Sequence, residues 1–270
     1  MPELPEVEVL RRDLLARMPK PPRIRAIRFL SPKLRTPLRL PKSLVGKTIL
    51  VRDIGRRSKF LIFKIDDGVL ISHLGMSGYW RAEKVRSEIK HDHVIIEWEN
   101  GDLWVYNDPR RFGVFEFYRD LSKAKWFSFL GPEPFTDEFL ASSVIDKIRS
   151  SERAIKSIIM DAKVMVGVGN IYASEALFKA GINPFKTGKR LSSARITRLL
   201  FAIRETLANA IEAGGSSIRD YVHASGEKGQ YQNEHLVYGR SGEKCTQCST
   251  KIQTKKIQGR STFWCRSCQS

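Results

Sequence analysis

The four cysteines of this 270-residue chain all lie in its last 26 residues. They form two pairs, Cys245-x2-Cys248 and Cys265-x2-Cys268, with 16 residues between the pairs. This spacing is typical of a zinc finger. Four thiolates fill the tetrahedral coordination of Zn²⁺, so we predict one structural zinc ion with no position open for catalysis. Disulfides are the alternative, and the cytoplasmic location that the sequence predicts disfavours them.

The chain is strongly basic, with 47 Lys and Arg against 29 Asp and Glu and a formal net charge of +18. This excess favours a nucleic-acid partner, because cations bound to phosphates release counterions. A membrane surface is less favoured, since the sequence contains no strongly basic amphipathic helix with a broad apolar face. No apolar run approaches the ~20 residues that span a bilayer, and no secretory segment follows Met1. We therefore expect a cytoplasmic protein with no membrane contact.

Hydrophobic periodicity divides the chain into regions. Residues 4–14 place apolar side chains three and four positions apart, which predicts a helix that starts near Glu3. Short β-rich runs follow and predict a two-layer β-sandwich. The runs are 23–29, 48–54, 59–65, 69–72, 94–98, 103–106 and 114–118. The breakers in 131–134 (GPEP) indicate a linker after this region.

The pattern beyond the linker is helical. We predict a cap at Thr136 or Asp137, a helix over about 154–160, a helix from about 170 that stops at Gly181, and a long helix from Ser192 to about 213. Residues 216–236 are rich in Ser, Gly and polar side chains, which predicts a loop. The fold class is therefore α+β with several domains. The predicted limits are 1–131 for the sandwich with its leading helix, 132–236 for the helical domain and 237–270 for the finger.

The N-terminus carries a second chemical signal, because Pro2 directly follows Met1 and precedes Glu3 and Glu6. Removal of the methionine would expose a secondary amine, and a free α-amine has a pKa of ~7.7–8.0. A secondary amine that attacks a masked aldehyde gives a cationic iminium, which acidifies the neighbouring C–H bond. Taken alone, these residues equally fit a proline that starts a helix and acids that complement the helix dipole.

Seven segments, in order along the whole chain, carry a family resemblance. They are 1–8 (MPELPEVE), 55–60 (GRRSKF), 73–78 (HLGMSG), 90–93 (KHDH), 108–113 (DPRRFG), 167–173 (GVGNIYA) and the four-cysteine finger. Together they resemble formamidopyrimidine-DNA glycosylases. The resemblance implies a β-sandwich, a helix-two-turn-helix domain and a zinc finger. It also implies a monomeric base-excision repair enzyme.

The resemblance implies that the enzyme removes 8-oxoguanine and formamidopyrimidines from double-stranded DNA and then cleaves the abasic site by β,δ-elimination. Pro2 is the implied nucleophile that forms a Schiff base, and Glu3 is the general acid/base. Lys59 and Arg260 would serve the elimination steps, since cations can neutralise departing phosphates. Glu6 would support the site. Residues 216–236 would contain the loop that caps the lesion.

Three residues match positions that fill the void left by a flipped base: Met76, Arg110 and Phe112. An apolar wedge and an aromatic ring can replace lost stacking, and a guanidinium can bond the orphaned cytosine. Without the resemblance, the methionine and the phenylalanine would be expected in the core. The implied DNA-binding residues are His73, His91, Arg110, Arg153, Lys156 and Asn170.

Two motifs have other interpretations, and two segments depart from the family pattern. His91 and His93 could share a strand face as metal ligands, although the sequence offers no third ligand nearby. The glycines in 167–173 mimic a dinucleotide fingerprint without its βαβ context, so we expect a turn that brings backbone N–H groups and Asn170 to a phosphate. Residues 150–153 (SSER) stand where the family has basic residues, so Arg153 or Lys156 would replace that contact. Residues 229–232 (GQYQ) stand where the family more often has Gly-Tyr-Phe, in the loop that would cap the lesion.

Two rival functions remain. Endonuclease VIII enzymes prefer oxidised pyrimidines, but they begin with Pro-Glu-Gly and lack the DPRRFG pattern, whereas this chain has Leu4 and residues 108–113. A catalytically silent zinc-finger protein that bends DNA is the rival from another class. The presence of Pro2, Glu3 and Lys59 argues against it.

Overall fold

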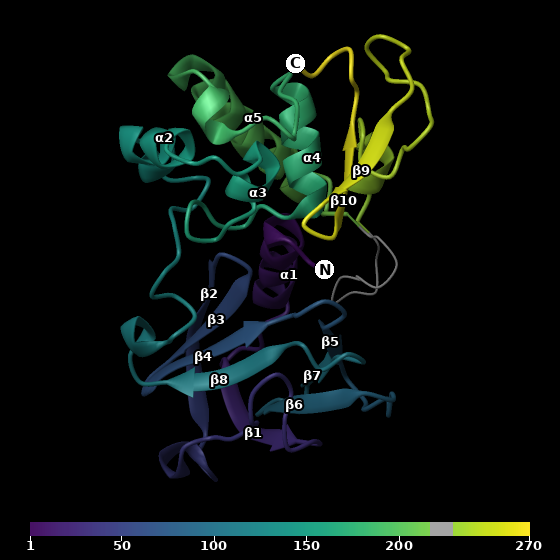
Figure 1. The fold of residues 1–270 in the computed structure, drawn as a ribbon. Coiled ribbons are helices and arrows are strands. Elements are labelled where there is room, and N and C mark those ends of the chain that lie inside the picture. The colour runs from purple at the N-terminus through teal and green to yellow at the C-terminus, as the bar shows by residue number, and fades with distance from the viewer. Residues whose placement is uncertain (217–228) are drawn as a thin grey trace. The chain divides into compact units, whose positions relative to one another are not determined.

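The structure is a computed structural model that describes residues 1–216 and 229–270 (Figure 1). Its contacts divide the chain into two compact units. The first unit consists of Met1–Ser128 with Gly214–Gln230, and the second of Phe129–Ala213 with Tyr231–Ser270. The division does not resolve the three domain limits 1–131, 132–236 and 237–270, which stay a prediction. The lesion-capping loop predicted within 216–236 lies mostly outside the described residues.

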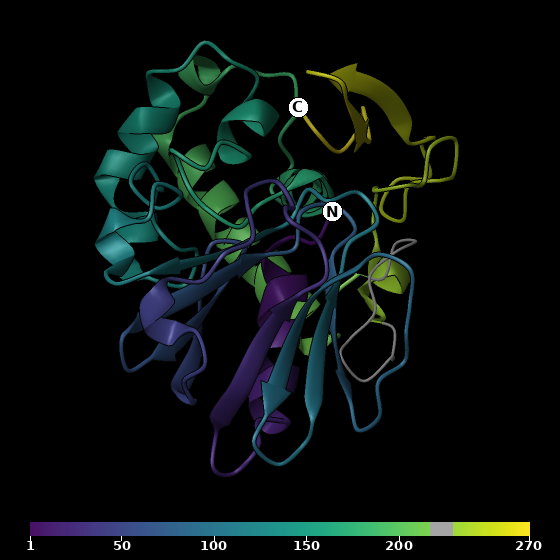
Figure 2. The same ribbon diagram turned by 90° about the horizontal axis from the view of Figure 1, so that it is seen from below.

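The first unit begins with helix α1, Leu4–Ala16, which packs against strands β2 and β3 (Figure 2). The strands of this unit follow in the order β1 Arg23–Phe29, β2 Ile49–Arg57, β3 Phe60–Ile65, β4 Gly68–His73, β5 Tyr79–Glu83, β6 Asp92–Trp98, β7 Leu103–Asn107 and β8 Val114–Tyr118. Short 3-10 turns cover Lys42–Leu44 and Leu121–Lys123.

All strand pairs in this unit are antiparallel, in the order β5-β7-β6-β1-β2-β3-β4-β8. The β1–β2 pairing has only two residue pairs, Arg23 with Leu50 and Ile24 with Ile49. The sheet therefore folds into two layers at this point. Its apolar core includes Phe63, Trp80, Trp98 and Trp104, all 1 % exposed or less. This architecture confirms the predicted β-sandwich with a leading helix.

Strand β5 is the one strand of the sandwich that the hydrophobic pattern did not predict. In Tyr79–Glu83 only Trp80 is buried, because β5 lies at the edge of the sheet and pairs with β7 alone. Because Arg81 and Glu83 are charged, this segment lacks the apolar run by which the other strands were predicted. Strand β2 also extends beyond its predicted end, since Arg56 and Arg57 continue the pairing with β3.

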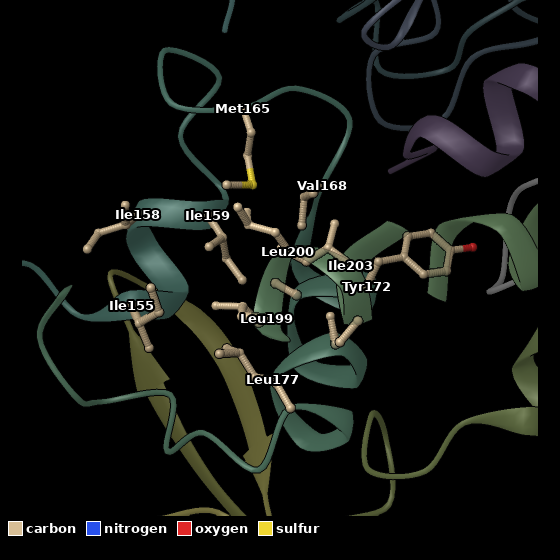
Figure 3. Packing of buried hydrophobic residues seen from close by; sticks show 14 of the residues in the cluster. Ile155, Ile158, Ile159, Met165, Val168, Tyr172, Leu177, Leu199, Leu200 and Ile203 are labelled. Atoms are coloured by element: carbon tan, nitrogen blue, oxygen red, sulfur yellow. The ribbon is translucent and has the colours of Figure 1, made fainter. Parts of the chain in front are cut away.

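The helices of the second unit are α2 Ser142–Arg149, α3 Ile155–Ile159, α4 Asn170–Lys179 and α5 Ser193–Glu212. Figure 3 shows their common apolar core, to which Ile158, Tyr172, Leu199 and Ile203 contribute. The long helix is confirmed, and the Ser192 hydroxyl caps it by accepting from the backbone N–H of Arg195. Short 3-10 turns cover Gly188–Arg190 and Tyr231–Glu234.

The predicted helix cap at Thr136 or Asp137 is wrong for an α-helix. Asp137–Leu140 forms only a 3-10 turn, and Thr136 makes no side-chain capping bond there. The extended backbone of Ala141 separates this turn from α2. The first α-helix of this region begins instead at Ser142.

The second unit ends in a hairpin of β9 Gln253–Ile257 and β10 Arg260–Trp264. Gln258 and Gly259 both have positive φ angles, which is the backbone that a tight two-residue hairpin turn needs. A small cluster beside the hairpin contains Phe178, Val237 and Ile252 with two of the cysteines. No helix in the described residues is long and apolar enough to cross a membrane.

Candidate active site and zinc centre

At the N-terminal end of α1, directly after Pro2, Glu3 and Glu6 bond each other's backbone through their carboxylates. The backbone N–H of Glu3 donates to Glu6 Oε2 at 2.7 Å, and the Glu3 carboxylate accepts from the backbone of Glu6. This capping box satisfies donors that a helix start leaves open. Pro2 is buried, and both carboxylates are only 2 % exposed. Pro2 is therefore a buried residue that directly precedes the capping box of Glu3 and Glu6.

Glu6 also fixes the segment that follows α5. Its Oε1 accepts from the backbone N–H of Ser216 at 2.8 Å. Gly215 has a φ of +78°, and a Cβ there would lie 3.1 Å from Glu6 Oε1. The predicted supporting residue thus joins the start of α1 to residues 215–216 of the same unit. Its assignment as a support for catalysis stays a prediction.

Lys59 lies in the turn between β2 and β3, and a carboxylate on α1 braces that turn. Glu8 Oε2 accepts from Arg56 Nε at 3.1 Å, and Arg56 Nη1 donates to the Ser58 carbonyl at 2.8 Å. Ser58 adopts a positive φ of 56°. Burial acts to raise the Glu8 pKa, but hydrogen bonds and charges of Arg11 and Arg56 lower it overall. An ionised Glu8 therefore ties the Lys59 turn to the helix that starts beside Pro2.

His73 ends β4 and lines a pocket of about 560 Å³ with Met1, Arg35, Gly75, Met76, Arg111 and Phe112. Burial, followed by the charges of Lys59 and Arg35, lowers the pKa of His73 to about 4. The ring is therefore neutral at pH 7. Its Nδ1 accepts from the backbone N–H of Gly75 at 3.0 Å, which leaves the proton on Nε2 as a donor. A neutral donor in this pocket suits a polar ligand atom better than a charge pair.

Two of the three predicted void-filling side chains are exposed apolar groups. Met76 is 39 % exposed, and Phe112 is 45 % exposed. The guanidinium of Arg110 lies over the Phe112 ring, 4.8 Å from its centroid. The structure therefore places these residues on the surface of the first unit rather than in its core. Their action on DNA stays a prediction.

The two histidines of residues 90–93 do not share a strand face. His91 precedes β6 with a φ of +74°, and its carbonyl accepts from the backbone N–H of Asp108. His93 is 2 % exposed and bonds Ser31 Oγ and the Asp108 carbonyl, each at 2.9 Å. His93 is thus a core residue. The metal interpretation of this pair is wrong in the described structure, whereas DNA binding by His91 remains a prediction.

The remaining candidates lie in the second unit. Asn170 is the first residue of α4, and its Nδ2 donates to the Ser261 carbonyl at 3.0 Å. Arg260 is exposed and begins β10 directly after the hairpin turn. Asn170 therefore lies at a helix start and Arg260 on a hairpin of the same unit. The DNA contact of Asn170 and the role of Arg260 in elimination stay predictions.

The two residues proposed to replace the missing basic contact differ sharply in exposure. The Arg153 side chain is 46 % exposed and pairs with Asp161 at 2.9 Å. Lys156 is 1 % exposed, and its Nζ bonds the Ser261 carbonyl and Thr262 Oγ1 at 3.1 and 3.0 Å. Lys156 therefore links α3 to β10. Of the two, Arg153 has the solvent-exposed side chain, and its contact with a phosphate stays a prediction.

The four cysteines converge after being separated along the chain by the hairpin. Their sulfur atoms lie within 4.8 Å of one another. Cys245 and Cys268 have Sγ atoms 3.8 Å apart, and Cys248 and Cys265 have Sγ atoms 3.4 Å apart. A tetrahedral site with Zn–S bonds of ~2.3 Å has sulfur edges of about 3.8 Å. Within residues 1–216 and 229–270, no other group of three or more potential ligands gathers in this way. The donor set fits one structural zinc ion.

Three family models match successive parts of the chain. The formamidopyrimidine-DNA glycosylase N-terminal domain matches residues 1–115, and the H2TH domain of the same family matches 130–222. The zinc finger found in FPG and IleRS matches 242–270. A β-sandwich, an H2TH helical domain and a zinc finger in this order define a DNA-repair glycosylase.

Full-length relatives show to which family the chain belongs. The formamidopyrimidine-DNA glycosylases of Bdellovibrio bacteriovorus and Idiomarina loihiensis are 44 % and 42 % identical to this chain, over the whole of each protein. Among solved structures, a Lactococcus lactis FPG mutant bound to DNA that contains Fapy-dG has a TM-score of 0.91 at 37 % identity, with both chains fully covered. The L. lactis Fpg bound to DNA with an abasic site has a TM-score of 0.91 at 38 % identity and 99 % coverage of both chains.

The chain belongs to the formamidopyrimidine-DNA glycosylase family. It is an enzyme of base-excision repair that acts on damaged DNA, and membership implies abasic-site lyase activity beside the glycosylase. The resemblance of the seven segments is thereby confirmed, as is the prediction of a zinc-binding DNA-repair enzyme.

Three residues that organise the site have no role in the sequence-based predictions. Glu8 and Arg56 brace the Lys59 turn, and the Asp108 carboxylate accepts several bonds from the loops that carry the void-filling side chains. The spacing of Glu8 from Arg11 and Arg12 was a visible helical signal. Asp108 belongs to the motif of residues 108–113, but nothing local in the sequence reveals its distant partner Ser77.

Proposed function

We propose that this enzyme removes oxidised purines, 8-oxoguanine and formamidopyrimidines, from double-stranded DNA and cleaves the resulting abasic site by β,δ-elimination. The observation that carries the proposal is the N-terminus of α1, where Pro2 is buried beside the capping-box carboxylates of Glu3 and Glu6. Relatives bound to DNA with Fapy-dG or an abasic site support the substrate class.

The reaction needs the free amine of the mature protein, without Met1. The Pro2 nitrogen bonds C1′ of the damaged nucleotide as the bond from C1′ to the base breaks, and the base leaves with a proton. Opening of the C1′–O4′ bond, with a proton delivered to O4′, gives the cationic iminium. Glu3 is the nearest carboxylate along the chain and is assigned to these proton transfers.

The iminium withdraws electrons and makes the C2′ proton labile. Its removal expels the 3′ phosphate, and a second elimination expels the 5′ phosphate. Lys59 and Arg260 are assigned to these steps as cations that bind the departing phosphates. Lys59 acts from the turn that Glu8 braces, and Arg260 acts from the hairpin of the second unit.

DNA contacts are assigned to exposed or donor groups. Met76, Arg110 and Phe112 fill the vacated stack, and His73, His91, Arg153 and Asn170 bind the strands or phosphates. Lys156 contributes through the hairpin that it holds. The enzyme works as a monomer in the cytoplasm, where chromosomal DNA of a bacterial type of cell is the substrate.

Rates of excision from matched duplexes test the substrate class. One duplex carries 8-oxoguanine opposite cytosine, and the other carries an oxidised pyrimidine at the same place. We expect faster release of the purine. Faster release of the pyrimidine would support the endonuclease VIII alternative, and tight binding with no release from either would support a silent DNA-bending protein.

A further inference from the structure

Asp108 begins the loop that carries Arg110 and Phe112, and its carboxylate is fully buried. Oδ1 accepts from Ser77 Oγ at 2.7 Å and from the backbone N–H of Arg110 at 3.2 Å. Oδ2 accepts from the backbone N–H of Gly113 at 2.8 Å. The carboxylate therefore bonds the backbone of its own loop both before and after Phe112, whose ring is exposed.

One of these bonds crosses to a second loop. Ser77 directly follows Met76, so the bond from its hydroxyl to Asp108 joins residues 31 positions apart. Tyr106 strengthens the same connection, because its hydroxyl lies 3.4 Å from Asp108 Oδ2 and 3.3 Å from the Leu74 carbonyl. Burial, and then the Asp108 charge, raise the pKa of Tyr106, so the phenol keeps its proton for donation.

Backbone contacts leave the two loops little freedom to separate or slide. A Cβ on Gly75 would lie 2.6 Å from the carbonyl carbon of Phe112 and the nitrogen of Gly113. Gly78 and Gly113 both face the Tyr106 hydroxyl so closely that a Cβ on either would overlap it. The two loops thus meet across glycines around one tyrosine and one carboxylate.

We propose that Asp108 is a positioning residue that holds the Met76 loop and the Arg110–Phe112 loop as one rigid unit, so that all three side chains enter the DNA together. The proposal rests on the proposed function, in which these side chains fill the space of the flipped nucleotide. Prior rigidity matters because side chains ordered only on binding would lower the rate of a step that needs them in place.

Both oxygens of Asp108 must act as hydrogen-bond acceptors, because the groups that surround them are donors. Two backbone N–H groups and one hydroxyl point at its oxygens, with the Tyr106 hydroxyl nearby. An asparagine has the same shape, but its amide nitrogen would place a donor against the donor of Gly113 or against those on Oδ1. D108N therefore removes the bonding pattern while it keeps the volume.

The chain offers a milder variant and a matched control. S77A removes only the hydroxyl that crosses between the loops. S72A removes another buried hydroxyl of the same sandwich, which accepts from Trp80 Nε1 at 3.0 Å and does not bond Asp108. Both variants lose one buried hydrogen bond, so a general loss of stability would affect them alike.

Two substrates separate positioning from chemistry. Single-turnover cleavage is measured on a duplex with an abasic site and on the same abasic strand without its complement, where no stack must be filled. We expect S77A to slow duplex cleavage about tenfold and D108N about 100-fold. Single-strand cleavage should stay within about twofold for both variants, and S72A should change neither rate. If D108N fails to fold, the comparison of S77A with S72A decides.

Equal losses by S77A and S72A, or equal losses on both substrates, would overturn the proposal. A second readout is independent of cleavage: 2-aminopurine placed opposite a stable abasic analogue reports entry of the side chains into the stack. S77A should reduce its fluorescence change at saturating protein, and an unchanged signal would also overturn the proposal. If the unsubstituted protein cleaves neither substrate, the proposed chemistry fails, and this signal still decides the role of Asp108.

Discussion

The N-terminal site and the zinc finger hold their functional residues in different ways. Around α1 and the sandwich loops, buried carboxylates such as Glu6, Glu8 and Asp108 bond backbone and side-chain donors over a large apolar core. The finger has a two-stranded hairpin and a small cluster of apolar residues. Such a hairpin is marginal alone, so its order depends on the metal together with the bonds from Lys156 and Asn170 to β10.

Because of this difference, we expect substitutions in the sandwich and metal loss in the finger to damage the structure in different ways. Loss of one carboxylate in the sandwich displaces a loop but leaves the core intact. Loss of the metal removes the bonds that join the two cysteine pairs flanking the hairpin that carries Arg260. For the same reason, the sequence predicts the zinc ligands, which have a recognisable spacing, but not the bonds between distant loops of the sandwich.

Removal of zinc should have the largest effect. Binding of structural zinc contributes ~10–16 kcal/mol of folding free energy in finger peptides. After chelation, we expect rapid hydrogen exchange in Gln253–Ile257 and Arg260–Trp264, with protection kept in Phe60–Ile65. Mass spectrometry of the exchanged protein measures both regions in one sample. Equal loss of protection in the two regions would contradict the prediction that zinc orders the hairpin and not the sandwich.

Blocking the N-terminal amine should have the next largest effect. An extra residue kept before Pro2 turns the amine into an amide, so we expect cleavage of abasic DNA to fall by at least ~10³-fold. The control is P2G, which keeps a free α-amine and should still form a covalent adduct. The rate of the extended protein on abasic duplex is the measurement, and an unchanged rate would exclude Pro2 as nucleophile.

Replacement of Glu8 tests the brace on the Lys59 turn. E8Q should cost about 1–3 kcal/mol of unfolding free energy at pH 7, because charge-assisted bonds to Arg56 and Arg11 are lost. The folded-state pKa of Glu8 is lowered, so its contribution is present above the ordinary Glu pKa of ~4.3 and is lost as the pH falls through the folded value. Denaturant titrations from pH 7 to pH 3 measure this.

The control for that titration is E88Q, since the Glu88 side chain is 82 % exposed and lies 3.6 Å from Arg86. Its stability should match that of the unsubstituted protein at every pH. A pH-independent deficit in E8Q would mean that packing, rather than the ionised carboxylate, stabilises the turn.

Replacement of Arg153 should have the smallest effect. Its ion pair with Asp161 is solvent-exposed, so R153A should change stability by less than about 1 kcal/mol. DNA affinity should weaken for all sequences alike, and the slope of log K against log salt should fall by about one. R52A, which removes an exposed ion pair of the first unit, is the control and should leave the slope unchanged.

The sequence predicted the parts of the molecule that local patterns determine. The apolar face of α5 and the spacing of the cysteines each lie within a short stretch of chain, and both predictions are confirmed. Strand β5 was missed because Trp80 is its only buried side chain. Its place in the sheet depends on pairing with β7 rather than on its own pattern.

The organisation of the site depended on contacts that no local pattern shows. Asp108 meets Ser77, and Glu8 meets Arg56, only after the sandwich has folded. The family resemblance implied a DNA contact for Lys156, yet its ammonium is buried against β10. A cation becomes a structural link when distant oxygens satisfy its donors.

Covalent trapping tests the central claim most directly. The mature protein, with Met1 removed, is treated with borohydride while it acts on a duplex that contains 8-oxoguanine opposite cytosine, and the cross-linked peptide is identified by mass spectrometry. A reduced sugar attached to the nitrogen of Pro2 is the predicted result. Attachment to a lysine, or no adduct while the base is released, would contradict the assignment of the N-terminal amine as nucleophile.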